Sequence, residues 1–426
     1  MAKIEPFCGL RYNRDIISDI STVTAPPNDS ISEEMRRELF KKSPYNIERI
    51  NFCENSSDSD ASESAAEFEN WIKEGILKYD LKPAVYIYEQ RFKMKSNPQS
   101  LKGIISLVKL EDYDKKIILP HQKTSAGSCE KRARLLRSVK ANLSPIFSLY
   151  IDDDISISSI IVAHSQRKPD ISFETPEGIT QNLWVVCDED FISSIQEKFK
   201  GSQIFIADGH HRYEAALKYR DEMHKKDGTK ETMPYDYTMM ALMPMYSSGL
   251  FVFPTHRLVK GTEHFDENIL INLMTEDFKV SRIYFTSNDY EKVILDRISD
   301  VIAEKYFGLY TGKDYYYLLK PVKKSKTSES SDIYQSLEAT MLNEMILEKY
   351  LGITEDMLEN PQYVTYTRSA KEAIRQVQLQ NYQCAFFLNS TRVHEMRLVA
   401  ESGKMMPIKS TFFWPKTTTG LVMYTF

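Results

Sequence analysis

The sequence predicts an α/β (α+β) fold, because apolar segments of strand length alternate with helical segments along most of the chain. One of these strand-to-helix transitions, at residues 204–226, also carries a dense cluster of ionisable side chains. At 426 residues the chain is longer than one typical hydrophobic core requires, so we expect it to divide into domains.

The composition indicates a soluble globular protein: 42% of the residues are hydrophobic, 27% are charged, and the formal net charge is −5. This mild negative charge gives no basis for a nucleic-acid-binding surface. No apolar run is long enough to span a bilayer, and the N-terminus lacks the apolar core of a signal peptide. The five cysteines are scattered and never form a CxxC pair, which argues against a structural zinc site. We therefore expect a cytoplasmic protein without membrane association.

Local signals predict the elements of the first part of the chain. Ser32 is a favourable N-cap and predicts a helix over residues 33–41, whereas the acidic, serine-rich segment 55–64 is predicted as a loop. β-Branched and aromatic residues predict strands at 84–92 and 103–110. The other expected elements are helices at 65–76, 130–142 and 210–226, and strands at 147–150, 183–187, 204–207, 237–244 and 250–254.

The rest of the chain continues the alternation of helices and strands. We expect helices at 268–275, 289–305 and 333–350, strands at 279–285, 307–310, 315–319 and 385–388, and a charged loop at 320–332. The predicted division is a core over residues 1–260, an insertion or second domain over 261–330, and a C-terminal segment over 331–426 that returns to the core.

The strongest functional signal is the segment from Ile204 to Leu217, where a short apolar strand passes through a tight turn into a helix. The N-terminus of such a helix presents unpaired N–H groups and a partial positive charge, which suit a phosphate. Asp208 could cap the helix without a ligand, but capping does not explain two histidines and an arginine beside it. We expect phosphate binding by Gly209, His211 and Arg212, proton transfer by His210 and His211, and a role as general base or Mg²⁺ ligand for Asp208.

Further segments carry side chains that suit an anion. His256 and Arg257 follow the predicted strand 250–254, where they could act as a catalytic histidine and a phosphate-binding arginine. Two other segments could bind an anion or have a structural role only. Residues 407–416 could be a buried aromatic strand, and the loop 120–124 with the basic helix after it could present a solvated helix face. The expected phosphate ligands there are Lys409, Ser410 and Thr411, the expected substrate-binding residues are His121, Thr124 and Arg132, and Asp29 and Asn46 are weaker substrate-binding candidates.

Several common enzyme signatures are missing from the sequence: GxxxxGK[ST], GxGxxG, GxSxG and HExxH do not occur. The sequence therefore lacks the marks of a P-loop kinase, a Rossmann oxidoreductase, an α/β-hydrolase and a zincin.

The segment Ile206–Ala216 closely resembles the hallmark of a large prokaryotic family known as domain of unknown function 1015. Ordered matches extend along nearly the whole chain, among them Leu10–Asn13, Ser43–Asn46, Pro254–Arg257, Met406–Thr411 and Pro415-Lys416. The turn is also similar, more distantly, to the nucleotide-contacting motif of the ParB/sulfiredoxin fold, which free serine kinases share. This resemblance implies a ParB/sulfiredoxin-like nucleotide-binding core with an additional α/β C-terminal part, and the phosphorylation of free L-serine.

Two departures from the family pattern bear on catalysis. The family usually has Pro-Pro-Tyr-Asp where this chain has Pro27-Asn28-Asp29, and Pro-His-Glu where it has Pro120-His121-Gln122. An amide has no useful proton affinity, so Gln122 cannot replace a catalytic glutamate. Either Asp208 or another carboxylate is then the base, or this member has lost or changed its activity.

The leading hypothesis is a phosphotransferase that uses ATP or ADP with Mg²⁺ to phosphorylate a small hydroxyl compound, with L-serine as the first candidate. Its partners would be a nucleotide and a small-molecule substrate. One alternative is a ParB-like module that binds or hydrolyses nucleotide without kinase activity. Another is a nuclease, which the net charge of −5 disfavours. A shared phosphate site further predicts that Lys409 lies near Arg212.

Overall fold

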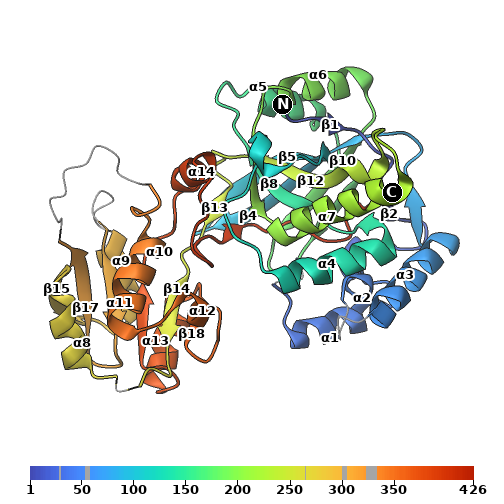
Figure 1. Cartoon of the computed structure of the whole chain (residues 1–426). Coiled ribbons are helices and arrows are strands. Elements are labelled where there is room, and N and C mark those ends of the chain that lie inside the picture. The colour runs from blue at the N-terminus through green and yellow to red at the C-terminus, as the bar shows by residue number, and fades with distance from the viewer. Residues whose placement is uncertain (28–29, 53–57, 264, 300–304, 323–332) are drawn as a thin grey trace. The chain divides into compact units, whose positions relative to one another are not determined.

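The computed structural model describes residues 1–27, 30–52, 58–263, 265–299, 305–322 and 333–426, and these form two compact units (Figure 1). The first unit comprises residues 1–120, 124–251 and 415–426, and the second comprises residues 121–123 and 252–414. A C-terminal segment that begins at Pro415 thus belongs to the first unit, whereas the expected division at residues 260 and 330 stays a prediction.

A mixed β-sheet organises the first unit. Its strands follow the order β6 (Ile118–Leu119), β11 (Ile204–Asp208), β8 (Ile146–Tyr150), β12 (Tyr237–Pro244), β5 (Asn97–Lys109), β4 (Val85–Met94), β10 (Thr180–Val186) and β9 (Ile171–Glu174), and β1 (Ile4–Glu5) pairs with β5. The pairs β11–β6 and β12–β8 are parallel, whereas the other neighbours are antiparallel. The α/β (α+β) prediction is confirmed.

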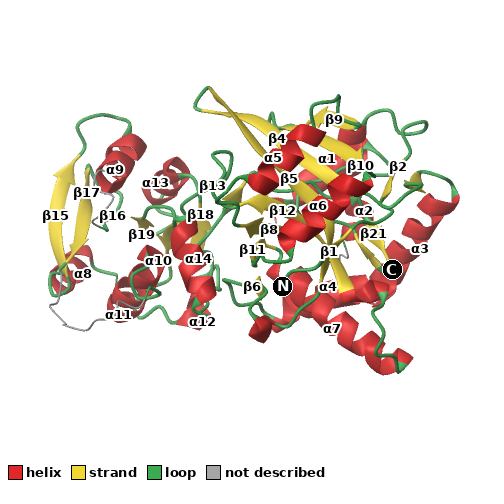
Figure 2. Ribbon diagram, turned by 90° about the horizontal axis from the view of Figure 1, so that it is seen from above, coloured by secondary structure: helices red, strands yellow, loops and turns green. Residues whose placement is uncertain are grey.

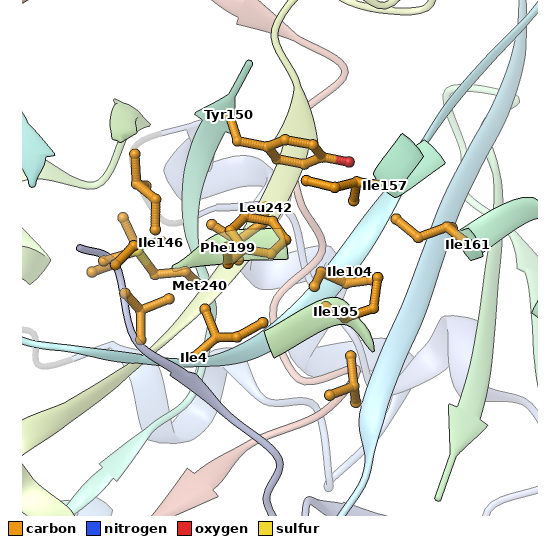
Figure 3. Packing of buried hydrophobic residues seen from close by; sticks show 14 of the residues in the cluster. Ile4, Ile104, Ile146, Tyr150, Ile157, Ile161, Ile195, Phe199, Met240 and Leu242 are labelled. Atoms are coloured by element: carbon orange, nitrogen blue, oxygen red, sulfur yellow. The ribbon is translucent and has the colours of Figure 1, made fainter. Parts of the chain in front are cut away.

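Helices cover this sheet and create its core. They are α1 (Glu33–Lys42), α2 (Glu48–Asn51), α3 (Asp58–Lys73), α4 (Ala126–Val139), α5 (Ser156–His164), α6 (Glu189–Phe199) and α7 (His210–Asp227), with short 3₁₀ turns at Ile20–Thr22, Tyr113–Lys115 and Pro234–Asp236. Figure 3 shows Ile157 and Ile161 of α5 and Phe199 of α6 packed against strand residues such as Ile104. Figures 1 and 2 show α4 and α7 side by side.

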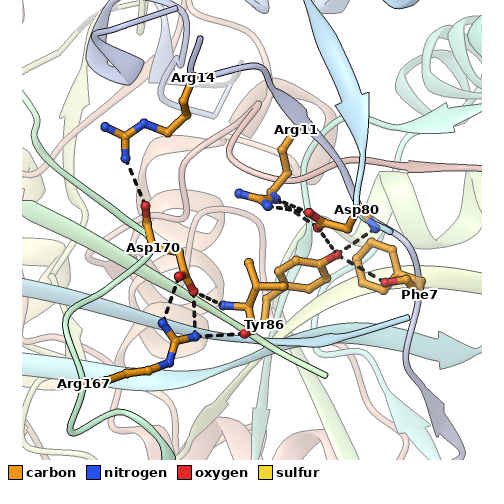
Figure 4. Close-up of polar contacts among 9 residues, drawn as sticks. Phe7, Arg11, Arg14, Asp80, Tyr86, Arg167 and Asp170 are labelled. Carbon is orange, nitrogen blue, oxygen red and sulfur yellow. Dashed lines mark hydrogen bonds and ion pairs between the residues drawn. The ribbon is translucent and has the colours of Figure 1, made fainter. Parts of the chain in front are cut away.

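Small strand pairs and a polar cluster fasten the chain ends of the first unit. β2 (Leu10–Tyr12) pairs with β3 (Leu77–Tyr79), and β21 (Tyr424–Thr425) pairs with β7 (Ala141–Asn142). Arg11 forms an ion pair with Asp80, whose Oδ2 accepts a 2.7 Å hydrogen bond from the Tyr86 hydroxyl (Figure 4). The same hydroxyl accepts from the backbone N–H of Gly9 at 2.7 Å, so the N-terminal segment is held on the sheet.

The second unit is built on an antiparallel sheet with a hydrophobic core on each face. Its strand order is β15 (Phe278–Tyr284), β17 (Tyr315–Pro321), β16 (Phe307–Tyr310), β19 (Cys384–Phe387), β14 (His256–Val259) and β18 (Val364–Thr367). Its helices are α8 (Glu267–Met274), α9 (Tyr290–Ser299), α10 (Glu338–Met341), the π-helical segment Leu342–Glu348, α11 (Lys349–Leu351), α12 (Glu355–Leu358), α13 (Ala370–Gln378) and α14 (Val393–Glu401). The short strands β13 (Phe251–Val252) and β20 (Phe413–Trp414) lie at two of the four places where the chain passes between the units.

Several predicted elements agree closely with the structure. Ser32 accepts a hydrogen bond from Met35 N as the N-cap of α1, and α7 begins at His210 as expected. Two local predictions are wrong. α3 already begins at Asp58, because acidic and small polar residues stabilise a first helical turn as well as they suit a loop. His256 and Arg257 lie in a strand, as the first residues of β14, instead of in the segment after a strand over 250–254, because Pro254 lacks a donor N–H and interrupts the strand before them.

Parts of other predictions fall outside the described residues, namely 300–304 and 323–332. Among the helices that the structure describes, none has the length and apolar character needed to cross a bilayer.

Candidate functional site

The centre of the candidate site is the turn between β11 and α7 in the first unit. Gly209 adopts φ 101°, a left-handed conformation that favours glycine. A Cβ atom on Gly209 would lie 2.8 Å from Nη2 and 2.9 Å from Nε of Arg212. The guanidinium of Arg212 therefore packs directly on the backbone of the turn, and a side chain at position 209 would be strained and would displace this guanidinium.

Asp208 ends β11 and lies between two cations. Its Oδ1 accepts a hydrogen bond from Lys416 Nζ at 2.8 Å, and its Oδ2 accepts one from Arg212 Nη2 at 3.2 Å. Burial by itself would raise the pKa of this carboxyl, but the charges of Lys416 and Arg212 outweigh burial and lower the pKa to about 2. Asp208 is consequently a carboxylate throughout the physiological pH range.

Both cations are held in place by further contacts. Arg212 Nη1 donates to the hydroxyl of Ser144 at 2.8 Å and to the carbonyl of Pro145 at 2.6 Å. The backbone carbonyl of Lys416 accepts from Gln90 Nε2 at 2.9 Å. These contacts fix the charges beside the helix N-terminus before any ligand binds, which reduces the entropy that a ligand must remove.

His211 and Glu214 connect α7 to the start of α4. His211 Nε2 accepts a hydrogen bond from the backbone N–H of Ser125 at 3.2 Å, while Glu214 accepts from the hydroxyl of Thr124 and from the thiol of Cys129. His210, which is buried, is close enough to add to the positive potential that lowers the pKa of Asp208. The turn and the adjoining helix thus form one connected polar region.

A cavity of about 60 Å³ adjoins this region in the first unit. Its polar lining comes from Asn51, Arg132, Asn142, Ser144 and Arg212, and its apolar lining includes Leu135, Leu136, Leu143 and Ile146. The structure therefore brings together Arg132 and Arg212, which were predicted as substrate and phosphate ligands. A volume of this size holds a few water molecules or a small polar group.

Buried polar residues position Arg132 at this cavity. Arg132 Nη1 lies 3.4 Å from Asn51 Oδ1, and Asn51 Nδ2 donates to Glu48 at 3.2 Å. Glu48 also pairs with Arg36 Nε at 3.2 Å. Burial raises the pKa of Glu48, although the hydrogen bonds from Asn51 and Arg36 act in the opposite direction.

Other predicted site residues lie in the second unit and meet there. His121 Nε2 and Gln122 Nε2 lie 2.9 Å and 3.1 Å from the hydroxyl oxygen of Thr411. The hydroxyl of Ser410 donates to the carbonyl of Pro407 at 2.6 Å, and Lys409 is exposed with φ 54°. The predicted proximity of Lys409 to Arg212 concerns two different units and stays a prediction.

His256 and Arg257 are both buried in the second unit, at the start of β14. Burial, and then the charge of Arg257, lowers the pKa of His256 to about 3, so the imidazole is neutral at pH 7. Its ring packs on Phe387 with centroids 5.1 Å apart. The proposed catalytic role of His256 would therefore have to use the neutral ring.

Asn46 is enclosed within the fold, whereas Asp29 lies outside the described residues. The amide Nδ2 of Asn46 donates to the carbonyls of Thr22 and Thr24, and its Oδ1 accepts from Glu48 N at 3.0 Å. Asn46 thus organises the loop before α2, and its predicted contact with substrate is untested.

The turn offers one carboxylate to a Mg²⁺ ion, so a bound nucleotide would have to supply further oxygen ligands. In the part of the chain that the structure describes, no group of three or more His, Cys, Asp or Glu side chains could hold a metal ion. Asp208 supplies one carboxylate at the turn. Since Mg²⁺ commonly binds one or two carboxylates together with substrate phosphates, Asp208 fits a Mg²⁺–nucleotide complex.

Lys416 is the site residue that the sequence prediction did not include. Its Nζ contacts Asp208 from 208 positions away in the sequence. The available signal was the closing Pro415-Lys416 pair, which matches the family pattern but had no local feature that connected it to the turn.

One protein-family model matches most of the chain. Residues 4–340 match the model of a family described as "Protein of unknown function (DUF1015)", and the chain belongs to this family. No curated protein matches the sequence.

Solved structures with a similar fold have low sequence identity to this chain. A conserved hypothetical protein from Pyrococcus furiosus is 13% identical with a TM-score of 0.34, over 74% of this chain and 93% of that protein. A free serine kinase in complex with AMP is 13% identical with a TM-score of 0.36, over 74% and 90% of the two chains. SbnI from Staphylococcus aureus, with a C-terminal truncation, is 10% identical with a TM-score of 0.33, over 75% and 82%. At these TM-scores the likeness carries no conclusion about activity.

Proposed function

We propose that this protein is a nucleotide-dependent phosphotransferase that transfers phosphate to the hydroxyl of a small metabolite, with free L-serine as the first candidate. The observation that carries the proposal is that the side chain of Arg212 contacts both the turn and the cavity. Its guanidinium pairs with Asp208 at the helix N-terminus, and the same side chain lines the cavity that contains Arg132. A phosphate on the turn and an acceptor in the cavity would therefore be neighbours.

The nucleotide phosphates would bind at the Gly209–Arg212 turn. Lys416 and Arg212 now share Asp208 as their anion, and a phosphate can compete with Asp208 for both. The first backbone N–H groups of α7 add donors, because Gly209 has no side chain to cap them. The site is thus a cationic cradle in which an internal carboxylate balances the charge until phosphate arrives.

Mg²⁺ would be held by Asp208 together with the nucleotide phosphates, and it would neutralise charge on the transferred group. With a pKa held at about 2, Asp208 is a weak base. We therefore assign Asp208 to the metal and leave proton transfer to His210 or His211. A strong base is not essential, because catalysis of phosphoryl transfer depends mainly on positioning and electrostatic stabilisation.

The acceptor would occupy the cavity beside Arg212. A guanidinium such as that of Arg132 can bind a carboxylate, and the polar side chains that line the cavity can bind the other polar groups of a compact acceptor. A free hydroxy amino acid satisfies both conditions. Seven further residues remain proposed contributors to phosphate or substrate binding. Thr124 belongs to the first unit, and the others belong to the second unit: His121, His256, Arg257, Lys409, Ser410 and Thr411.

The test is a matrix of phosphate donors and acceptors. Purified protein is incubated with Mg²⁺, with ATP or ADP, and with L-serine, L-threonine or glycerol, and products are identified by mass spectrometry. Formation of O-phosphoserine with one donor supports the proposal and identifies that donor. Nucleotide binding or hydrolysis without any phosphorylated acceptor would instead favour a ParB-like nucleotide-binding module.

A further inference from the structure

Arg257 presents an unusual combination of burial and missing partners in the second unit. The side chain lies on β14 and is wholly buried. Its Nη1 donates to the carbonyl of Thr255, whereas Nε and Nη2 have no hydrogen-bond partner. A buried charged group is normally paired, because its removal from water is costly.

The two unpartnered nitrogens define one specific edge of the guanidinium. Nε–H and one N–H of Nη2 are parallel and point in the same direction, which is the fork that binds a carboxylate or phosphate through two hydrogen bonds. The internal hydrogen bond uses only the other terminal nitrogen, Nη1. The side chain is therefore anchored at one end and retains its complete bidentate edge.

An aromatic ring lies beside the guanidinium of Arg257. Tyr366 pairs with Arg257 across β18, and its ring centroid lies 5.4 Å from the guanidinium carbon. Arg368 follows β18 and stacks at 3.9 Å over Phe412. Within the described residues, neither Arg257 nor Arg368 forms an ion pair with a carboxylate.

Arg257 and Tyr366 are cross-strand neighbours on one face of the sheet. Arg368 is two residues after Tyr366 and is exposed in the bend between β18 and α13. His256 points to the opposite face, where it packs on Phe387. Burial lowers the pKa of Arg257 to about 10, so this group is still a cation at neutral pH.

We propose that the second unit contains a binding site for a small dianionic oxyanion of the phosphate class, in which Nε and Nη2 of Arg257 form the bidentate contact and Arg368 supplies the second positive charge. Arg257 is also a proposed contributor to the phosphotransferase, but all residues of this site belong to the second unit, so phosphate binding to it can be measured separately from the turn of the first unit. Because the fork is covered, the covering residues must move aside when the anion binds.

The experiment uses a variant in which the phosphate site of the first unit is weakened, Lys416→Met. Binding of inorganic phosphate to this protein is measured by calorimetry at constant ionic strength, with chloride as the reference salt. A second titration with O-phospho-L-serine shows whether the site prefers free phosphate or a phosphomonoester. Phosphate binding is expected, and the added substitution Arg257→Met should weaken it at least tenfold. Arg282→Met is the matched control, because Arg282 stacks over Tyr315 at 4.5 Å but donates to the hydroxyl of Tyr317.

Thermal unfolding provides an independent measurement. Without phosphate, Arg257→Met should melt at the same temperature as the Lys416→Met parent or higher, because an unpaired buried charge has been removed. If Arg257→Met does not fold, Arg257→Lys keeps the charge without the fork and should still lose at least tenfold in affinity. Equal phosphate affinity in the parent and the Arg257 variant, or no phosphate binding by the parent, would overturn the proposal.

Discussion

Lys416 Nζ lies 2.8 Å from Oδ1 of Asp208, although the two residues are 208 positions apart in the sequence. This contact joins the C-terminal segment to the turn at the end of β11, and it gives the turn a second cation besides Arg212. The proposed phosphate site therefore depends on the tertiary fold, because the C-terminal segment supplies one of its two cations.

Substitution of Asp208 by Asn separates phosphate binding from turnover. Asp208→Asn removes the carboxylate that would hold Mg²⁺, so turnover should fall by about two orders of magnitude or more. Nucleotide binding without Mg²⁺ should be unchanged or tighter, because Lys416 and Arg212 lose their competing anion. Steady-state kinetics and calorimetry measure the two effects, and unchanged turnover would exclude the assigned role.

The pH dependence of stability should report the ion pairs of Asp208. Its folded-state pKa is depressed to about 2, so its stabilising contribution is present above the pKa of the unfolded chain near 4 and is lost as the pH falls towards 2. A depression of this size corresponds to roughly 2 kcal/mol. Urea unfolding should show that the difference in free energy between the wild type and Asp208→Asn is largest at pH 6–7 and shrinks below pH 4.

Asp153→Asn is the control for this pH series, because Asp153 is exposed. Its difference from the wild type should be small at every pH. A difference for Asp208→Asn that stays constant from pH 7 to pH 3 would show that the ion pairs do not stabilise the fold.

The two glycines that flank α7, Gly209 and Gly228, allow a matched test of the turn. Gly209→Ala combines left-handed strain with contacts at 2.8–3.0 Å to the guanidinium of Arg212, so it should displace Arg212 and weaken nucleotide binding at least tenfold. Gly228→Ala introduces the same kind of strain at φ 65° with open space around the new Cβ. Each variant should lose about 1 kcal/mol of stability or more, but only Gly209→Ala should lose nucleotide affinity. Equal nucleotide affinity in both would contradict the close packing of Arg212 on the turn as a functional feature.

Arg132→Met tests the acceptor cavity. If Arg132 binds the carboxylate of the acceptor, the substitution should raise KM for the acceptor about tenfold or more and leave nucleotide affinity unchanged. Lys131→Met changes an exposed neighbour on the same helix and should leave KM for the acceptor as it is. An unchanged KM for the acceptor in Arg132→Met would show that Arg132 and its cavity do not bind the acceptor.

The turn could be predicted from sequence because its signals are local. The strand from Ile204, the left-handed Gly209 and the start of the helix at His210 all follow from adjacent residues. Lys416 could not be predicted in the same way, since its role arises from a contact between distant segments. The cavity shared by Arg132 and Arg212 likewise depends on the packing of α4 beside α7.

Local signals also failed where two structures use the same residue types. The segment after Asp58 is acidic and serine-rich, which suits a loop and a helix N-terminus equally, and α3 begins there. At His256, the predicted strand was displaced by a few residues, because the break at Pro254 was not given enough weight. Arg257 was expected to bind phosphate, but its burial and free fork could be learned only from the packed sheet.

The most direct test of the central claim is calorimetric titration of ADP and ATP, with Mg²⁺, into the wild type and into Lys416→Met, with the exposed Lys93→Met as the control. We predict that the wild type and Lys93→Met bind one nucleotide with equal affinity and that Lys416→Met binds it at least tenfold more weakly. Equal affinity in all three proteins, or the absence of nucleotide binding by the wild type, would contradict a phosphate site built on Asp208, Arg212 and Lys416.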